Sequence, residues 1–250
     1  MKYWKAVLVG VVQGVTEFLP VSSSGHLTIL AKLSIAPTSV FYNLALHLAT
    51  LLALVIVMRR DVYEVVRHPI KGEGKYILLA SLPTAAIALI FKKCFPALLT
   101  GSLLGFGFLL TAAILFLSEW LCRERVGKML GVKESLLIGL MQGVAVLPGV
   151  SRSGSTIAAA RICGVSPDRA ARFSFLLSIP VILGGFVLEG MESGFTAVGA
   201  DLPEILIAAG SAFVSGLLAL RFMLNAVKKR GLKIFALYTF LVGILCYFLH

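Results

Sequence analysis

The chain has 250 residues, of which 58% are hydrophobic and 14% are charged, and its formal net charge is +11. A soluble globular domain averages roughly 45–50% apolar and about 25% charged residues, so this composition excludes a soluble domain, a disordered chain and a coiled coil, and indicates lipid as the solvent. The basic residues lie between apolar segments, as in cytoplasmic loops of membrane proteins, which argues against nucleic acid as a partner.

Along the chain, the apolar sequence divides into six continuous runs and two broken regions. The broken regions, 4–34 and 135–163, are interrupted by proline- and serine-containing stretches at 19–26 and 147–156. The apolar segment on either side of each interruption has about 12–15 residues, too short to span a bilayer at 1.5 Å per residue. The pattern therefore predicts two re-entrant hairpins. The continuous runs are long enough, or nearly so, to be transmembrane helices, and cover approximately 40–58, 76–95, 99–118, 170–189, 204–224 and 233–249.

The loops between these runs predict the orientation in the membrane. Loops 59–75, 119–134 and 221–233 each carry four or five lysines and arginines, whereas loop 190–203 carries none. Positively charged loops stay in the cytoplasm. Six crossings and two hairpins place all three basic loops on that side, so both termini and the first hairpin face outward. We expect a multi-pass protein of the plasma membrane.

Short motifs of the first half recur in the second. Gln-Gly-Val at 13–15 recurs at 142–144, and Ser-x-Ser-Gly at 22–25 recurs at 151–154, an offset of 129 residues. Each half holds one hairpin and three crossings, and an odd number of crossings inverts the second half. The predicted fold is therefore an all-α integral membrane domain over 1–250, with six transmembrane helices and two re-entrant hairpins, arranged as inverted repeats with halves approximately 1–129 and 130–250.

The two breaks combine charged groups with helix starts. Glu17, His26 and Arg152 fall at apolar depth, where an ionisable residue is costly and indicates function. Gln13 lies on the same helix face as Glu17, four residues away. Each break opens a helix whose free N–H groups and positive dipole end favour an anion, and the Arg152 fork favours phosphate.

This combination favours phosphoryl transfer over phosphate transport. A carboxylate beside phosphate indicates a bridging divalent cation or proton transfer. His26 lies within one helical turn of Ser23, so together with Glu17 and Arg152 the pair supplies a nucleophile, a proton carrier and a charge clamp. The further residues predicted to bind substrate are Ser22, Ser24, Gly25, Ser151, Ser153, Gly154 and Thr156.

Structural and functional alternatives stay open at this point. The serines could serve only as helix N-caps, and Glu17 with Arg152 could be a structural ion pair within the membrane. His47, in the middle of an apolar run, is assigned to hydrogen bonds between packed helices. A transporter or lipid flippase is the alternative function, because inverted repeats with broken helices are also typical of transporters.

The segment QGVTEFLPVSSSGH at 13–26, together with PGVSRSGST at 148–156, resembles the undecaprenyl-pyrophosphate phosphatase family, the bacitracin-resistance proteins. The resemblance extends over the whole chain, through 41–61 and 173–180. It implies a membrane hydrolase that removes the terminal phosphate of a polyprenyl pyrophosphate lipid and leaves the monophosphate carrier for cell-wall and surface-glycan assembly. The acid phosphatases share a Ser-Gly-His element, but their other signatures are absent from this sequence.

The resemblance also implies roles for particular residues. A divalent cation, Mg²⁺ or Ca²⁺, is expected at Gln13 and Glu17, although many family members have a second carboxylate in place of the glutamine. Arg152 and Thr156 are expected to hold phosphate. Ser23 as nucleophile with His26 as general base and acid is one hypothesis, and His26 as nucleophile or as activator of water is the other. The family's outward-facing active site agrees with the orientation predicted from charge. A homo-oligomer is left open.

Overall fold

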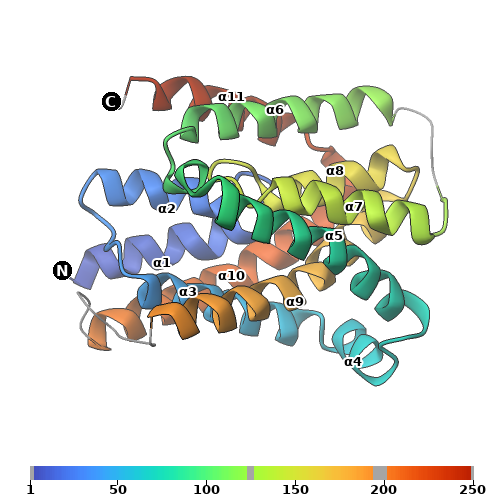
Figure 1. Cartoon of the computed structure of the whole chain (residues 1–250), viewed down its shortest axis with the longest axis horizontal. Helices are drawn as coiled ribbons and strands as arrows, with labels where there is room; N and C mark the ends of the chain where they lie inside the picture. Colours follow the sequence, from blue (N-terminus) through green and yellow to red (C-terminus); the bar gives the residue numbers. More distant parts are fainter. Residues whose placement is uncertain (1–2, 123–126, 194–201, 249–250) are drawn as a thin grey trace.

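The computed structural model describes residues 3–122, 127–193 and 202–248, and these contain helices and no β-strand (Figure 1). The all-α prediction is confirmed for this part of the chain. The helices are α1 (Tyr3–Phe18), α2 (Ser23–Lys32), α3 (Val40–Val57), α4 (Arg59–Arg67), α5 (Gly72–Cys94), α6 (Leu104–Leu121), α7 (Val132–Val144), α8 (Arg152–Ile162), α9 (Pro167–Ser193), α10 (Leu202–Arg230) and α11 (Lys233–Cys246), with a 3₁₀ turn η1 (Pro96–Thr100).

Among the described residues, five helices are long and apolar enough to cross a membrane: α3, α5, α6, α9 and α10. These correspond to five of the six predicted runs. The sixth run forms α11, which is apolar but has only 14 residues among those described. The run predicted at 99–118 starts later, because Gly101 adopts a left-handed φ of 82° that separates η1 from α6.

The loop predicted at 59–75 contains a helix, α4, that the apolar pattern did not indicate. None of its residues is buried, and its sequence contains no apolar run that would predict a helix. Asp61 in its first turn and Arg67 in its last turn complement the helix dipole. Arg59 and Arg60 in the first turn do not, but Val62 and Val65 pack partly buried against the hydrophobic core, so α4 is an amphipathic helix that a search for apolar runs does not find.

Each broken region forms two helices separated by a sharp break. Ser22 caps α2, and its hydroxyl accepts the Gly25 N–H at 3.3 Å. Ser151 caps α8 in the same way, accepting the Gly154 N–H at 3.1 Å. The predicted pattern of helix, break and helix is present in both regions.

Helices far apart in the sequence pack side by side. α1 lies along α10 and α7 lies along α5, while α6 packs against α11. Glycines permit the close approach, since a Cβ added at Gly10 would meet the Ala208 carbonyl oxygen at 2.1 Å, and one at Gly139 would meet that of Ala80 at the same distance. Small residues at such positions are typical of helix contacts in membranes.

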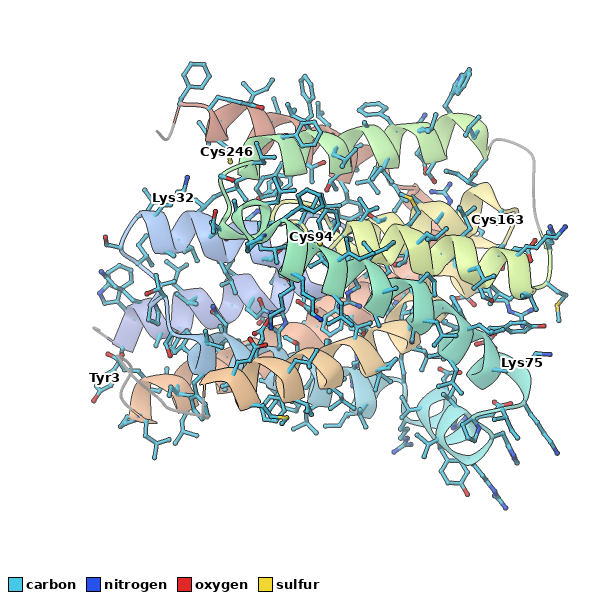
Figure 2. The ribbon with its side chains drawn as sticks, viewed as in Figure 1. Tyr3, Lys32, Lys75, Cys94, Cys163 and Cys246 are labelled. Atoms are coloured by element: carbon cyan, nitrogen blue, oxygen red, sulfur yellow. The ribbon has the colours of Figure 1, made fainter. Side chains whose placement is uncertain are left out.

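The two ends of the molecule are marked by different elements. The start of α1 and the end of α11 lie at one end and α4 lies at the other (Figure 1). Figure 2 shows Tyr3 and Lys32 at the first end and Lys75 at the end that bears α4. Residues 123–126 of the second basic loop and 194–201 of the acidic loop lie outside the described residues.

Candidate active site

The two breaks lie against each other in the interior. A Cβ on Gly25 would lie 3.0 Å from the Cα of Gly149, and a Cβ on Gly154 would lie 3.2 Å from the Cβ of Pro20. The hydroxyl of Ser153 donates a hydrogen bond to the carbonyl oxygen of Leu19 at 3.1 Å. Glycine at both helix starts therefore lets the N-termini of α2 and α8 converge.

Glu17 links the two breaks. Its Oε1 accepts a hydrogen bond from Arg152 Nη2 at 2.5 Å, and its Oε2 accepts one from Ser23 Oγ at 2.6 Å. The side chain of Glu17 is 4% exposed. The structure thus brings together Glu17, Ser23 and Arg152, three of the four residues predicted to be catalytic, around one carboxylate.

Arg152 keeps one edge of its guanidinium group unused. Nη1 is buried and has no hydrogen-bond partner among the described residues. An unpaired buried donor costs about 1–3 kcal/mol, so a native protein keeps one where a ligand satisfies it. With Nη2 committed to Glu17, the free Nη1 can donate to a phosphate oxygen.

Gln13 and His47 complete the surroundings of Glu17. Gln13 Nε2 donates to Glu17 Oε2 at 3.0 Å and lies 3.1 Å from His47 Nδ1. His47 Nδ1 is in turn 3.4 Å from Glu17 Oε2. The interhelical hydrogen bond expected of His47 is present, but its partners make His47 a member of the site, which we did not predict. No sequence signal places α3 beside the end of α1.

His26 is held by different partners. Its Nδ1 lies 2.7 Å from the carbonyl oxygen of Ser22, which can only accept, so Nδ1 carries the proton and Nε2 accepts from the Tyr238 hydroxyl at 2.7 Å. The ring also stacks on Tyr238 and contacts Phe108 edge-on. The Glu17 carboxylate, and not the His26 ring, therefore contacts the Ser23 hydroxyl. Tyr238, 212 residues from His26, is a second member that the sequence did not indicate.

The remaining residues predicted to bind substrate form hydrogen bonds within the protein, at the second break and at the helix starts. Thr111 of α6 accepts the Ser151 N–H at 2.9 Å and donates to the Gly149 carbonyl at 2.9 Å. Thr156 is fully buried, and its hydroxyl contacts that of Ser174 on α9 at 2.5 Å. Its expected contact with phosphate stays a prediction. Ser24 is exposed, and its hydroxyl is 3.3 Å from that of Ser22.

Comparison with known proteins decides the family. The family model described as bacitracin resistance protein BacA matches residues 6–245. The chain belongs to the BacA family. The family resemblance seen in the motifs of the two breaks is thereby confirmed.

Relatives within the BacA family match over nearly their whole length. The chain is 35% identical over 261 residues to a protein of Korarchaeum cryptofilum, covering 98% of each chain, and 38% identical over 253 residues to one of Carboxydothermus hydrogenoformans, covering 98% of this chain and 96% of the relative. A Christiangramia forsetii relative is 37% identical over 257 residues, covering 98% and 97%. All three are named undecaprenyl-diphosphatase. The transporter alternative finds no support among them.

Proposed function

We propose that this BacA-family protein is an undecaprenyl-diphosphatase, a membrane enzyme that hydrolyses a polyprenyl pyrophosphate to the monophosphate lipid and inorganic phosphate. The name shared by its relatives supports this activity. The observation that carries the proposal is the Glu17 carboxylate, which holds the Ser23 hydroxyl and the Arg152 guanidinium where two helix N-termini converge. The product would serve as carrier lipid for cell-wall and surface-glycan synthesis.

The geometry supports Ser23 as the nucleophile. Its hydroxyl is 2.6 Å from Glu17 Oε2, which accepts the proton as Ser23 Oγ attacks the terminal phosphorus. The bond from that phosphorus to the bridging oxygen breaks, and the monophosphate lipid leaves. Arg152 and the N–H groups at the two helix starts stabilise the charge that develops. Water then hydrolyses the phosphoserine and releases inorganic phosphate.

His26 as the nucleophile receives less support. Both of its ring nitrogens have partners at 2.7 Å, the Ser22 carbonyl and the Tyr238 hydroxyl. To attack phosphorus, Nε2 would first have to lose the Tyr238 hydroxyl. We therefore assign His26 to proton transfer through Nε2, which can take up the proton that the Tyr238 hydroxyl donates to it, while the bond from Nδ1 to the Ser22 carbonyl fixes the tautomer.

The divalent cation expected from the family resemblance fits the residues at Glu17. The side chain of Gln13 is fully buried, and its Oε1 has no hydrogen-bond partner among the described residues. Amide and carboxylate oxygens suit divalent cations, so Gln13 and Glu17 would hold the ion. Bound there, it would neutralise pyrophosphate charge that otherwise repels Glu17.

The packing supports the inverted repeat, and the basic loops support the predicted orientation. The α1–α10 and α7–α5 contacts are equivalent under the repeat, and Gly10 and Gly139, which lie in them, are 129 residues apart. α1 has 16 residues, about 24 Å of helix, which is shorter than the roughly 30 Å of the hydrocarbon core. We therefore propose halves of approximately 1–129 and 130–250, two re-entrant hairpins, six crossings and an outward-facing active site.

Phosphate release by purified protein tests the function. The full chain in detergent, supplied with farnesyl or undecaprenyl pyrophosphate, should release inorganic phosphate, and the Glu17→Ala variant should not. Glu64→Ala is a matched control, because Glu64 lies on the unburied helix α4. Wild-type protein that binds the lipid but releases no phosphate would contradict the proposal.

A further inference from the structure

Three side-chain atoms from two helices form a compact triangle beside Ser23. Gln13 Nε2 and Glu17 Oε2, both on α1, are 3.0 Å apart. His47 Nδ1, on α3, is 3.1 Å from the first and 3.4 Å from the second. Glu17 Oε1 takes no part, because it is bonded to Arg152.

The spacing of these atoms suits the ligands of a single metal ion. Bonds of about 2.0–2.2 Å place neighbouring ligands about 2.8–3.1 Å apart in an octahedral ion and about 3.3–3.6 Å apart in a tetrahedral one. The observed 3.0, 3.1 and 3.4 Å fall across these ranges. Three donors on one side of an ion leave the other positions for water or phosphate oxygens.

Gln13 can present oxygen to this triangle. Rotation about its last side-chain bond exchanges the amide nitrogen and oxygen, which have nearly the same shape. The nitrogen now bridges Glu17 and His47, while the oxygen is buried without a partner among the described residues. After this rotation, Gln13 Oε1 would lie in the triangle as a ligand for an ion, and Nε2 would lie outside the triangle.

We propose that His47 is the third protein ligand of the cation site, together with Glu17 and Gln13. The role of the ion in turnover rests on the proposed function, whereas its binding does not. His47 compensates for the neutral glutamine at position 13. Its side chain is 31% exposed, so an ion can reach it.

An imidazole ligand changes which metal the site favours. Mg²⁺ and Ca²⁺ prefer sites made only of oxygen, whereas imidazole suits transition-metal ions. This chain should therefore bind Mn²⁺ more tightly than Mg²⁺ or Ca²⁺. In a His47→Gln variant, the difference in affinity between Mn²⁺ and Mg²⁺ or Ca²⁺ should be smaller, because all three protein ligands of the ion would then be oxygen atoms.

Electron spin-echo spectroscopy of bound Mn²⁺ tests the ligand directly. Metal-stripped full chain in detergent, loaded with Mn²⁺, should show ¹⁴N modulation from a coordinated imidazole. His47→Gln should lose this signal and bind Mn²⁺ about tenfold or more weakly, while His26→Gln should keep it. No Mn²⁺ binding by the wild-type chain, no ¹⁴N modulation, or a signal that persists in His47→Gln would overturn the proposal.

Two additions keep this test independent of folding and of the enzyme activity. Gln13→Glu, which adds a carboxylate, should tighten Mn²⁺ binding and keep the ¹⁴N signal, and its failure to bind Mn²⁺ would count against the site. Phosphate release is measured in parallel. Phosphate release without any imidazole-bound Mn²⁺ would refute His47 as a ligand but not the phosphatase activity. An imidazole-bound Mn²⁺ ion without phosphate release would refute the phosphatase activity but not the ligand.

Discussion

Glu17 and Arg152 lie 135 residues apart in the chain, yet their side chains form an ion pair with Oε1 and Nη2 at 2.5 Å. Glu17 lies near the end of α1 and Arg152 at the start of α8, so the pair joins the two broken regions of the sequence. The same carboxylate contacts Ser23 through its other oxygen. Glu17 and Arg152 therefore form the ion pair of the structural interpretation and are also the two residues to which the catalytic interpretation assigns a role.

Removing the Arg152 side chain should abolish most activity. Arg152→Ala loses the free Nη1 and the charge that stabilises the transition state, so kcat for phosphate release should fall by at least about 10²–10³. Arg152→Lys should recover little, because a single ammonium nitrogen lacks the planar fork that reaches Glu17 and phosphate from two separate nitrogens. Arg169→Ala, which removes a partner of Glu73 away from the site, serves as control. An Arg152→Ala enzyme with near-normal kcat would refute this placement of the site.

The identity of the nucleophile can be read from the trapped intermediate. Wild-type enzyme quenched during turnover of β-labelled polyprenyl pyrophosphate, in which the terminal phosphate carries the label, should yield an acid-stable, alkali-labile phosphoserine. Ser23→Ala should yield no labelled protein, while Ser102→Ala should label normally, since Ser102 is exposed and its hydroxyl bonds the Ala97 carbonyl away from Glu17. Acid-labile label that survives in Ser23→Ala would instead identify His26 as the nucleophile.

Tyr238 should act through His26. Tyr238→Phe keeps the stacked ring but removes the hydroxyl that donates to His26 Nε2 at 2.7 Å. The loss of one hydrogen bond, about 0.5–1.5 kcal/mol, should lower kcat roughly two- to tenfold and alter the pH profile of kcat. Tyr247→Phe is the control on the same segment. An unchanged pH profile would mean that the Tyr238 hydroxyl has no influence on His26.

The glycines between the halves should be intolerant of a side chain. Alanine at Gly10 or Gly139 would place Cβ 2.1 Å from a backbone oxygen of the facing helix, and such overpacking typically costs about 1–3 kcal/mol. Thermal unfolding in detergent should show a lower Tm for both variants. Gly210→Ala on α10 should be neutral, because nothing lies within 4 Å of its added Cβ. Equal Tm values for all three variants would contradict the packing.

Labelling from each side of the membrane tests the orientation. In a background without the native cysteines, a cysteine at Tyr63 on α4 should react only with a reagent that reaches the cytoplasm. A cysteine at Trp4, in the first turn of α1, should react with an impermeant reagent added outside. Both positions are exposed. Reaction of the two from the same side would contradict the proposed topology.

Local pattern accounts for what the sequence predicted well. The two breaks follow from proline and from the serine caps at 22 and 151, which act within one turn of their helices. Glu17 and Gln13 share a face because they are four residues apart. Helix α4 escaped prediction because its charged, unburied residues leave no apolar run.

By itself, the sequence determined that the chain is a multi-helix membrane protein with two broken segments, and that Glu17, Ser23, His26 and Arg152 are the residues to examine. Only the tertiary structure decided that Glu17 contacts the Ser23 hydroxyl, and that His47 and Tyr238 join the site. The physical reason is that apolar length, caps and spacing act within one helix. Which helices become neighbours depends instead on the close packing of α1 with α10 and of α5 with α7.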